Sequence, residues 1–319
     1  VLQLNIFGHQ SVDLHKAFED IIATLNKAGN EYDLKIANRL YGQKNYSFLD
    51  KFVQESSLYY NAPLQSVDFA DSEPTRKLIN TWVEDQTNDK IKDLIPTGYL
   101  NRMTVMVLVN AVYFKGDWVY TFKEVDTEKK IFNPSNKKVN MMQIKENTDK
   151  FKYYHDTSLK TKVIELPYKG NDVCMYIFLP DAQDGLQAME SALDETKLND
   201  IIGKVAKTDI QYIAIPKIKM TLKYELVEYF KKLGVNDLFG SAADLSGLTE
   251  NSVHVSAILH KTFVDINEKG TEAAGATAVI IKESAPMNPV RFEANHPFLF
   301  LIWEKTTKSI LFMGRMVEP

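Results

Sequence analysis

Residues 264–289 read VDINEKGTEAAGATAVIIKESAPMNP, and from Gly270 to Ile281 nearly every side chain is small or β-branched. If this segment forms a strand, one face carries no charge, because Glu272 falls on the other face. Small side chains can enter a packed sheet without overpacking it, and Gly270 and Gly275 add backbone freedom. The pattern leaves two interpretations open. One is an Ala-rich helix or surface loop, and the other is a segment that is a loop in one state and a buried strand in another.

The sequence around this segment predicts a mixture of helices and strands. Residues 282–289 are polar and interrupted by prolines, which indicates an exposed loop. Helices are predicted at residues 12–25, from Asp71 through Val83, and at residues 222–233, with Thr221 as the N-cap and Gly234 at the end. Strands are predicted at residues 103–114, 161–167, 173–179, 210–220, 290–292, 298–303 and 309–313.

The composition indicates one large α+β domain. The 319 residues are 45% hydrophobic and 25% charged, without a repeat or a linker. The net charge of −4 lacks the electrostatic signature of a general nucleic-acid binder. The longest apolar run, residues 103–114, is shorter than the roughly 20 residues that span a bilayer. Neither a nucleic acid nor a membrane is therefore an expected partner.

The sequence contains none of the usual patterns of an active site. It has no G-x-S-x-G turn, no Gly-rich phosphate loop and no histidine pair at zinc-binding spacing. Its single cysteine, Cys174, lies in an apolar run and is interpreted as a buried side chain without catalytic function. We therefore expect no enzyme activity, no metal and no cofactor.

Several segments together resemble the serpin family of serine protease inhibitors. They are residues 264–277, Ile79-Asn-Thr-Trp-Val-Glu84, Leu108-Val-Asn-Ala-Val-Tyr-Phe-Lys-Gly-Asp-Trp118, Asn295-His-Pro-Phe-Leu-Phe300 and Phe312-Met-Gly-Arg315. The resemblance implies an α+β fold with three β-sheets, surrounding helices and an exposed reactive-centre loop at about residues 268–290. It also implies a single domain over residues 1–319 that is incomplete at its N-terminus, because family members begin several tens of residues earlier.

The same resemblance assigns residues to parts of the inhibitory machinery. The loop would be cleaved at Ser284-Ala285, and the cleaved loop would insert into the central sheet. Asn110 and His260 resemble the shutter pair that controls sheet opening, and Trp118 resembles the aromatic residue at the breach. The hinge of the loop would consist of Glu268, Gly270, Thr271, Glu272, Ala273, Ala274, Gly275, Ala276 and Thr277.

These assignments predict a suicide inhibitor that forms a covalent acyl complex with a target serine protease. The alternative is a non-inhibitory serpin that acts as a carrier, chaperone or storage protein, but such relatives tend to have charged or bulky residues or proline in the hinge. The small Ser284 favours an elastase-like target, whereas cleavage at Lys282-Glu283 would suit a trypsin-like enzyme and Met287 a chymotrypsin-like one. We expect a monomer able to form loop-sheet polymers. An extracellular location is favoured over a cytoplasmic one, with glycosylation at Asn45 in an Asn-Tyr-Ser sequon.

Overall fold

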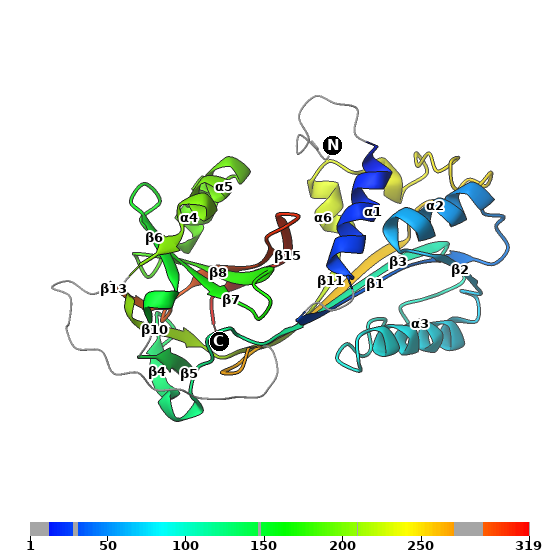
Figure 1. Cartoon of the computed structure of the whole chain (residues 1–319). Coiled ribbons are helices and arrows are strands. Elements are labelled where there is room, and N and C mark those ends of the chain that lie inside the picture. Colours follow the sequence, from blue (N-terminus) through cyan, green and yellow to red (C-terminus); the bar gives the residue numbers. More distant parts are fainter. Residues whose placement is uncertain (1–12, 28–30, 146–147, 209, 271–289, 319) are drawn as a thin grey trace. The chain divides into compact units, whose positions relative to one another are not determined.

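The computed structural model describes residues 13–27, 31–145, 148–208, 210–270 and 290–318 (Figure 1). The chain divides into two compact units. The first contains Val1–Phe114 and Met220–Val264, and the second contains Lys115–Lys219 and Asp265–Pro319.

The first unit is built on a five-stranded sheet with the order β11-β12-β3-β1-β2. Its strands are β1 (Tyr32–Gln43), β2 (Leu64–Val67), β3 (Met106–Gly116), β11 (Ile218–Glu225) and β12 (Ala257–Ile266). The neighbouring strands β3 and β12 run parallel, with Ala257 opposite Val107 and Phe263 opposite Tyr113. The last residues of β3 and β12 and the first two of β11 fall in the second unit.

Helices cover both faces of this sheet (Figure 1). They are α1 (Leu14–Leu25), α2 (Asp50–Tyr60), α3 (Ser72–Gln86), α6 (Val227–Lys232) and the short η3 (Asp237–Phe239). On one face Ile79 of α3 belongs to the same core cluster as Val107, and on the other Phe52 of α2 packs in the cluster of Met106. Successive residues of β3 therefore point into two cores, and this double burial explains why the strand is apolar almost throughout.

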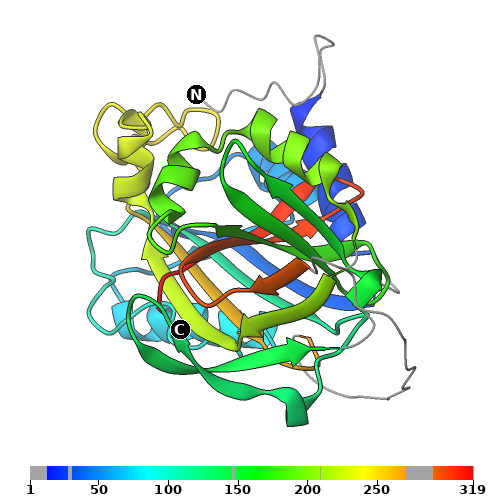
Figure 2. The same ribbon diagram turned by 90° about the vertical axis from the view of Figure 1, so that its left-hand side faces the viewer.

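The second unit contains the other two sheets. The four-stranded sheet has the order β13-β10-β5-β4, and the six-stranded sheet has the order β15-β14-β8-β7-β6-β9. Helices α4 (Leu186–Ala192) and α5 (Glu195–Lys204) lie beside the six-stranded sheet (Figure 2). Their residues Leu186 and Ile201 pack in one core cluster with Phe178 of β8. The bounds are η1 (Glu124–Asp126), β4 (Glu128–Phe132), β5 (Lys137–Ile144), η2 (Thr148–Lys150), β6 (Lys152–Asp156), β7 (Thr161–Pro167), β8 (Val173–Pro180), α4 (Leu186–Ala192), α5 (Glu195–Lys204), β9 (Ala206–Lys207), β10 (Ile210–Pro216), β13 (Val290–Glu293), β14 (Phe298–Glu304) and β15 (Ser309–Met316).

The α+β class with three sheets and surrounding helices is thus confirmed. β7 has the predicted bounds, and β8, β3 and α1 differ from the predicted ones by one to three residues at an end. No helix in the described ranges is long and apolar enough to cross a bilayer.

The helix predicted at residues 222–233 is wrong over its first half. Residues up to Glu225 belong to β11, and α6 covers only Val227–Lys232. β11 pairs with β12, and the Leu226 amide also donates a hydrogen bond to the Ile258 carbonyl over 2.8 Å. These backbone pairings outweigh a weak local helix preference, so the apolar spacing is divided between a strand and a helix. Gly234 follows α6 with φ of +91°, as a helix-terminating glycine does.

Candidate functional site

The described part of the predicted hinge is a tight turn directly after β12. The Asn267 amide donates to the Gly270 carbonyl over 2.9 Å, and the Gly270 amide donates back over 3.2 Å. Gly270 has φ of +127°, and a Cβ at this position would lie 2.6 Å from the backbone nitrogen of Trp118. Both the backbone conformation and the lack of space therefore require glycine here.

Trp118, the predicted breach residue, packs against this turn. Its side chain is 1% exposed, and its Nε1 donates a hydrogen bond to the Asn267 carbonyl over 3.0 Å. Its backbone amide donates to the Lys269 carbonyl over 3.0 Å. The indole stacks on the ring of Tyr168 with centroids 4.3 Å apart and an interplanar angle of 16°. No sequence pattern pointed to Tyr168 as a partner, because it lies 50 residues from Trp118.

Glu268 anchors the same turn through a buried carboxylate. Glu268 is 5% exposed, and its Oε1 accepts a hydrogen bond from Thr127 Oγ1 over 2.7 Å. Its Oε2 forms an ion pair with Lys217 Nζ over 2.8 Å. Burial alone would raise the pKa of Glu268, but the hydrogen bonds from Lys217 and Thr127 outweigh it, so the pKa is lowered. The carboxylate is therefore charged at neutral pH and holds the turn to two other segments of the second unit.

Asn110 and His260 meet across the paired strands β3 and β12. They are direct partners in the parallel register, and the His260 ring contacts Asn110 Oδ1 through its Nδ1. Asn110 Nδ2 donates to Asn38 Oδ1 on β1 over 2.6 Å, so Nδ1 of His260 is assigned as the protonated nitrogen of the neutral ring. Asn38 extends the predicted pair into a hydrogen-bonded network of three side chains on three strands. No sequence pattern had pointed to Asn38.

The environment of His260 favours its neutral form. Burial lowers the pKa of the ring. The Tyr224 ring on β11 stacks on the imidazole with centroids 6.2 Å apart. The hydrogen-bond chain and this stacking link the side chains of β1, β3, β12 and β11.

The remaining predicted site residues are divided between described and undescribed parts of the chain. Thr271 to Thr277 of the hinge and the predicted reactive bond Ser284-Ala285 lie outside the described residues. Asn45 is exposed in the turn that follows β1.

The described residues offer little chemistry of their own. Cys174 is fully buried, and burial raises its thiol pKa to about 12, which leaves the thiol protonated and unreactive at neutral pH. Across the described ranges, no group of three or more His, Cys, Asp or Glu side chains could hold a metal ion. What the structure brings together is the turn after β12 with its anchors and, separately, a network of polar side chains across a sheet.

Known proteins match this chain along its full length. Residues 1–319 match the family model described as Serpin (serine protease inhibitor). Human Serpin B4 is 40% identical over 315 residues, which cover 97% of this chain and 80% of that protein. Human leukocyte elastase inhibitor is 41% identical over 315 residues, which cover 96% and 83%. The crystal structure of uncleaved ovalbumin is similar with a TM-score of 0.84 at 32% identity, covering 97% of this chain and 80% of that one. With the whole chain matched by one family model, and with relatives at about 40% identity, the chain belongs to the serpin family.

Proposed function

We propose that this serpin is a suicide inhibitor of a serine protease. The protease attacks the reactive-centre loop and becomes acylated, and the cleaved loop then inserts between β3 and β12 before the acyl bond is hydrolysed. The observation that carries the proposal is the hinge sequence itself. Between Gly270 and Ile281 the face that must turn inward holds no charged or bulky polar side chain, so its burial meets no desolvation penalty from an ionised group.

The described contacts are compatible with a hinge at this position. The chain leaves β12, turns at Asn267–Gly270 and is held there by Trp118 and Glu268. The two strands that must separate are connected by the His260–Asn110 contact at the level of their side chains. Inhibition in this scheme is a competition between insertion and deacylation, and these contacts contribute to the rate of insertion.

An elastase-like protease is the favoured target. Ser284, the residue before the proposed reactive bond, has a small neutral side chain that suits a restricted primary pocket. One relative named above supports this assignment, since it is named as an inhibitor of leukocyte elastase. A trypsin-like target would instead be cleaved after Lys282, and a chymotrypsin-like target after Met287.

The proposal is tested by mixing the protein with pancreatic elastase, leukocyte elastase, trypsin and chymotrypsin. We expect an SDS-stable complex with an elastase and release of a C-terminal peptide that begins at Ala285, identified by mass spectrometry. A peptide that begins at Glu283 would move the reactive bond to Lys282. Cleavage by every protease without any stable complex would contradict inhibition and favour the carrier, chaperone or storage role.

The cellular location is a separate question from the mechanism. We propose an extracellular location and glycosylation at Asn45, on the strength of the sequon and the exposure of this side chain. Expression in a secretory host followed by digestion with a glycosidase tests both, and an unchanged mass would contradict the glycan.

A further inference from the structure

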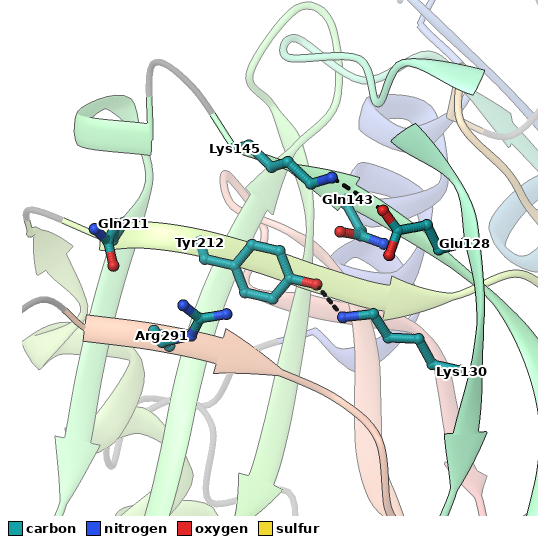
Figure 3. A pocket seen from close by; sticks show the side chains of 7 residues that line it. All are labelled: Glu128, Lys130, Gln143, Lys145, Gln211, Tyr212 and Arg291. Carbon is teal, nitrogen blue, oxygen red and sulfur yellow. Dashed lines mark hydrogen bonds and ion pairs between the residues drawn. The ribbon is translucent and has the colours of Figure 1, made fainter. Parts of the chain in front are cut away.

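A polar groove of about 430 Å³ lies on one face of the four-stranded sheet of the second unit (Figure 3). Side chains from all four strands line it: Glu128 and Lys130 of β4, Gln143 of β5 with Lys145 just after it, Gln211 and Tyr212 of β10, and Arg291 of β13. Three of these side chains are cations and one is a carboxylate. The groove therefore offers mostly donors.

The centre of the groove is a buried tyrosine between two cations. Tyr212 is 6% exposed. The Arg291 guanidinium lies 4.5 Å and the Lys130 ammonium 5.0 Å from the centroid of its ring. Lys130 is fully engaged, because its Nζ donates to Tyr212 Oη over 2.6 Å and pairs with Glu293 over 3.1 Å. Lys145 is likewise paired with Glu128, over 3.1 Å.

One donor in the groove is left open. Arg291 is exposed, and its guanidinium makes no ion pair with any acid in the described part of the chain, only the contact with the Tyr212 ring. Gln143 is 1% exposed, and its Nε2, buried beside Glu128 (Figure 3), helps to lower the pKa of that carboxylate, so this donor is closed to a docked partner. A guanidinium that lies over an aromatic ring and has no acidic partner is complementary to a carboxylate. An acidic stretch of polypeptide supplies such a carboxylate.

The position of Arg291 in the chain identifies where such a polypeptide would come from. Arg291 is the second residue of β13, six residues after Ala285, so at most about 20 Å of extended chain separates it from the proposed reactive bond. A protein interface of ordinary size covers about 800 Å² on each partner, which corresponds to a disc of about 16 Å radius. A protease bound at the loop therefore has its own surface near the groove, with Arg291 at the rim of the contact.

We propose that this groove is a secondary docking site for an acidic surface segment of the target protease, a role that rests on the inhibitory function proposed above. A carboxylate of the protease pairs with Arg291 over the Tyr212 ring. Charge pairs at the rim of an interface act mainly on the association rate and on its salt dependence. The groove thus selects among proteases that the loop sequence alone would accept.

The experiment compares the wild-type protein with Arg291→Glu and with Lys129→Glu. Lys129 is an exposed residue of β4 between Glu128 and Lys130, so its side chain points away from the groove and its substitution changes the net charge equally. Association rate constants are measured at low and at high salt with pancreatic and leukocyte elastase. Binding of the same proteases, inactivated by replacement of their nucleophilic serine with alanine, is measured by surface plasmon resonance.

For a protease with acidic residues beside its active site, we expect Arg291→Glu to lower the association rate about threefold to tenfold at low salt and less at high salt. Lys129→Glu should change the association rate little, and neither variant should change the stoichiometry of inhibition. Replacing the acidic residues of the protease by lysine should restore the association rate of Arg291→Glu. Equal rates for all three proteins with every inhibited protease would overturn the docking site while leaving inhibition intact. If no covalent complex forms, Arg291-dependent binding of an inactivated protease would support the site without the inhibitory function, and absence of that binding would overturn both.

Discussion

Replacing Glu268 by lysine should destabilise the protein, because the substitution puts a second cation where the structure buries a paired carboxylate. Glu268 is 5% exposed and engaged by Thr127 over 2.7 Å and by Lys217 over 2.8 Å. The variant loses both interactions and brings two ammonium groups together. The turn after β12 would then lose its side-chain anchor, although the backbone contacts of Trp118 remain.

The magnitude follows from these two contacts. Hydrogen bonds to a charged group contribute about 1.5–3 kcal/mol. Two like charges about 4 Å apart repel by about 4 kcal/mol at an effective dielectric constant of 20, but the side chain of Lys217 is 41% exposed and can turn into solvent, which removes most of this repulsion. We therefore expect a loss of about 2–4 kcal/mol in the free energy of unfolding, or a decrease of about 3–6 °C in Tm.

The assay is differential scanning calorimetry of the wild-type protein, Glu268→Lys, Lys217→Glu and the double variant with the charges exchanged. If the ion pair causes the effect, the double variant should regain part of the stability that each single variant loses. Native gels after mild heating would show whether the loosened turn also promotes polymers. Unchanged Tm in Glu268→Lys, or a double variant whose losses simply add, would refute the reasoning.

Four further predictions concern the loop and the sheet. Cleavage near Ser284 should raise Tm sharply, because an added strand contributes backbone hydrogen bonds and apolar burial on the order of 10 kcal/mol; superimposable calorimetric curves for intact and cleaved protein would contradict insertion. Thr271→Arg should convert the inhibitor into a substrate that releases active protease, because an unpaired buried cation costs several kcal/mol, whereas Glu272→Arg on the outward face should still inhibit; trapping by Thr271→Arg equal to wild type would exclude strand insertion. His260→Ala should form polymers more readily on mild heating, and an unchanged monomer fraction on native gels would exclude this role. Because burial lowers the pKa of His260 in the folded state, the stability that its neutral ring contributes is present above the pKa of about 6.5 in the unfolded chain and is lost as the pH falls below it. Tm of the wild type should therefore fall more steeply from pH 7 to 5 than Tm of His260→Gln, and parallel curves would contradict this.

Local sequence patterns predicted the elements whose burial is uniform and missed those that depend on a distant partner. β7 and β8 were predicted correctly because each is an apolar run bounded by turn residues, and both are strands in the structure. The segment around Leu222 was misassigned because its apolar spacing also fits a helix, and only the pairing of β11 with β12 decides for a strand. Nothing in the local sequence encodes that pairing.

The same limit applies to the site. The family resemblance pointed to Trp118, Asn110 and His260, and the structure brings the last two into contact. It could not supply the partners that hold them, because Tyr168 and Asn38 are distant in sequence and have side chains that are common in ordinary cores. Lys217, which pairs with Glu268, is one of 38 Lys and Arg residues, and charge pairing at a separation of about 50 residues leaves no sequence pattern.

The parallel register of β3 and β12 has a topological consequence. Both strands run in the same direction, with Ala257–Phe263 beside Val107–Tyr113. A segment that continues from the end of β12 through a reverse turn runs opposite to β12, and therefore opposite to β3 as well. Such a segment needs only a hairpin-like turn, whereas a strand added in the parallel sense needs a crossover of a dozen or more residues. Inserting such a segment between β3 and β12 would replace one parallel strand pairing by two antiparallel pairings without rethreading the chain. Of the two strands, only β12 is followed directly by such a turn, at Asn267–Gly270.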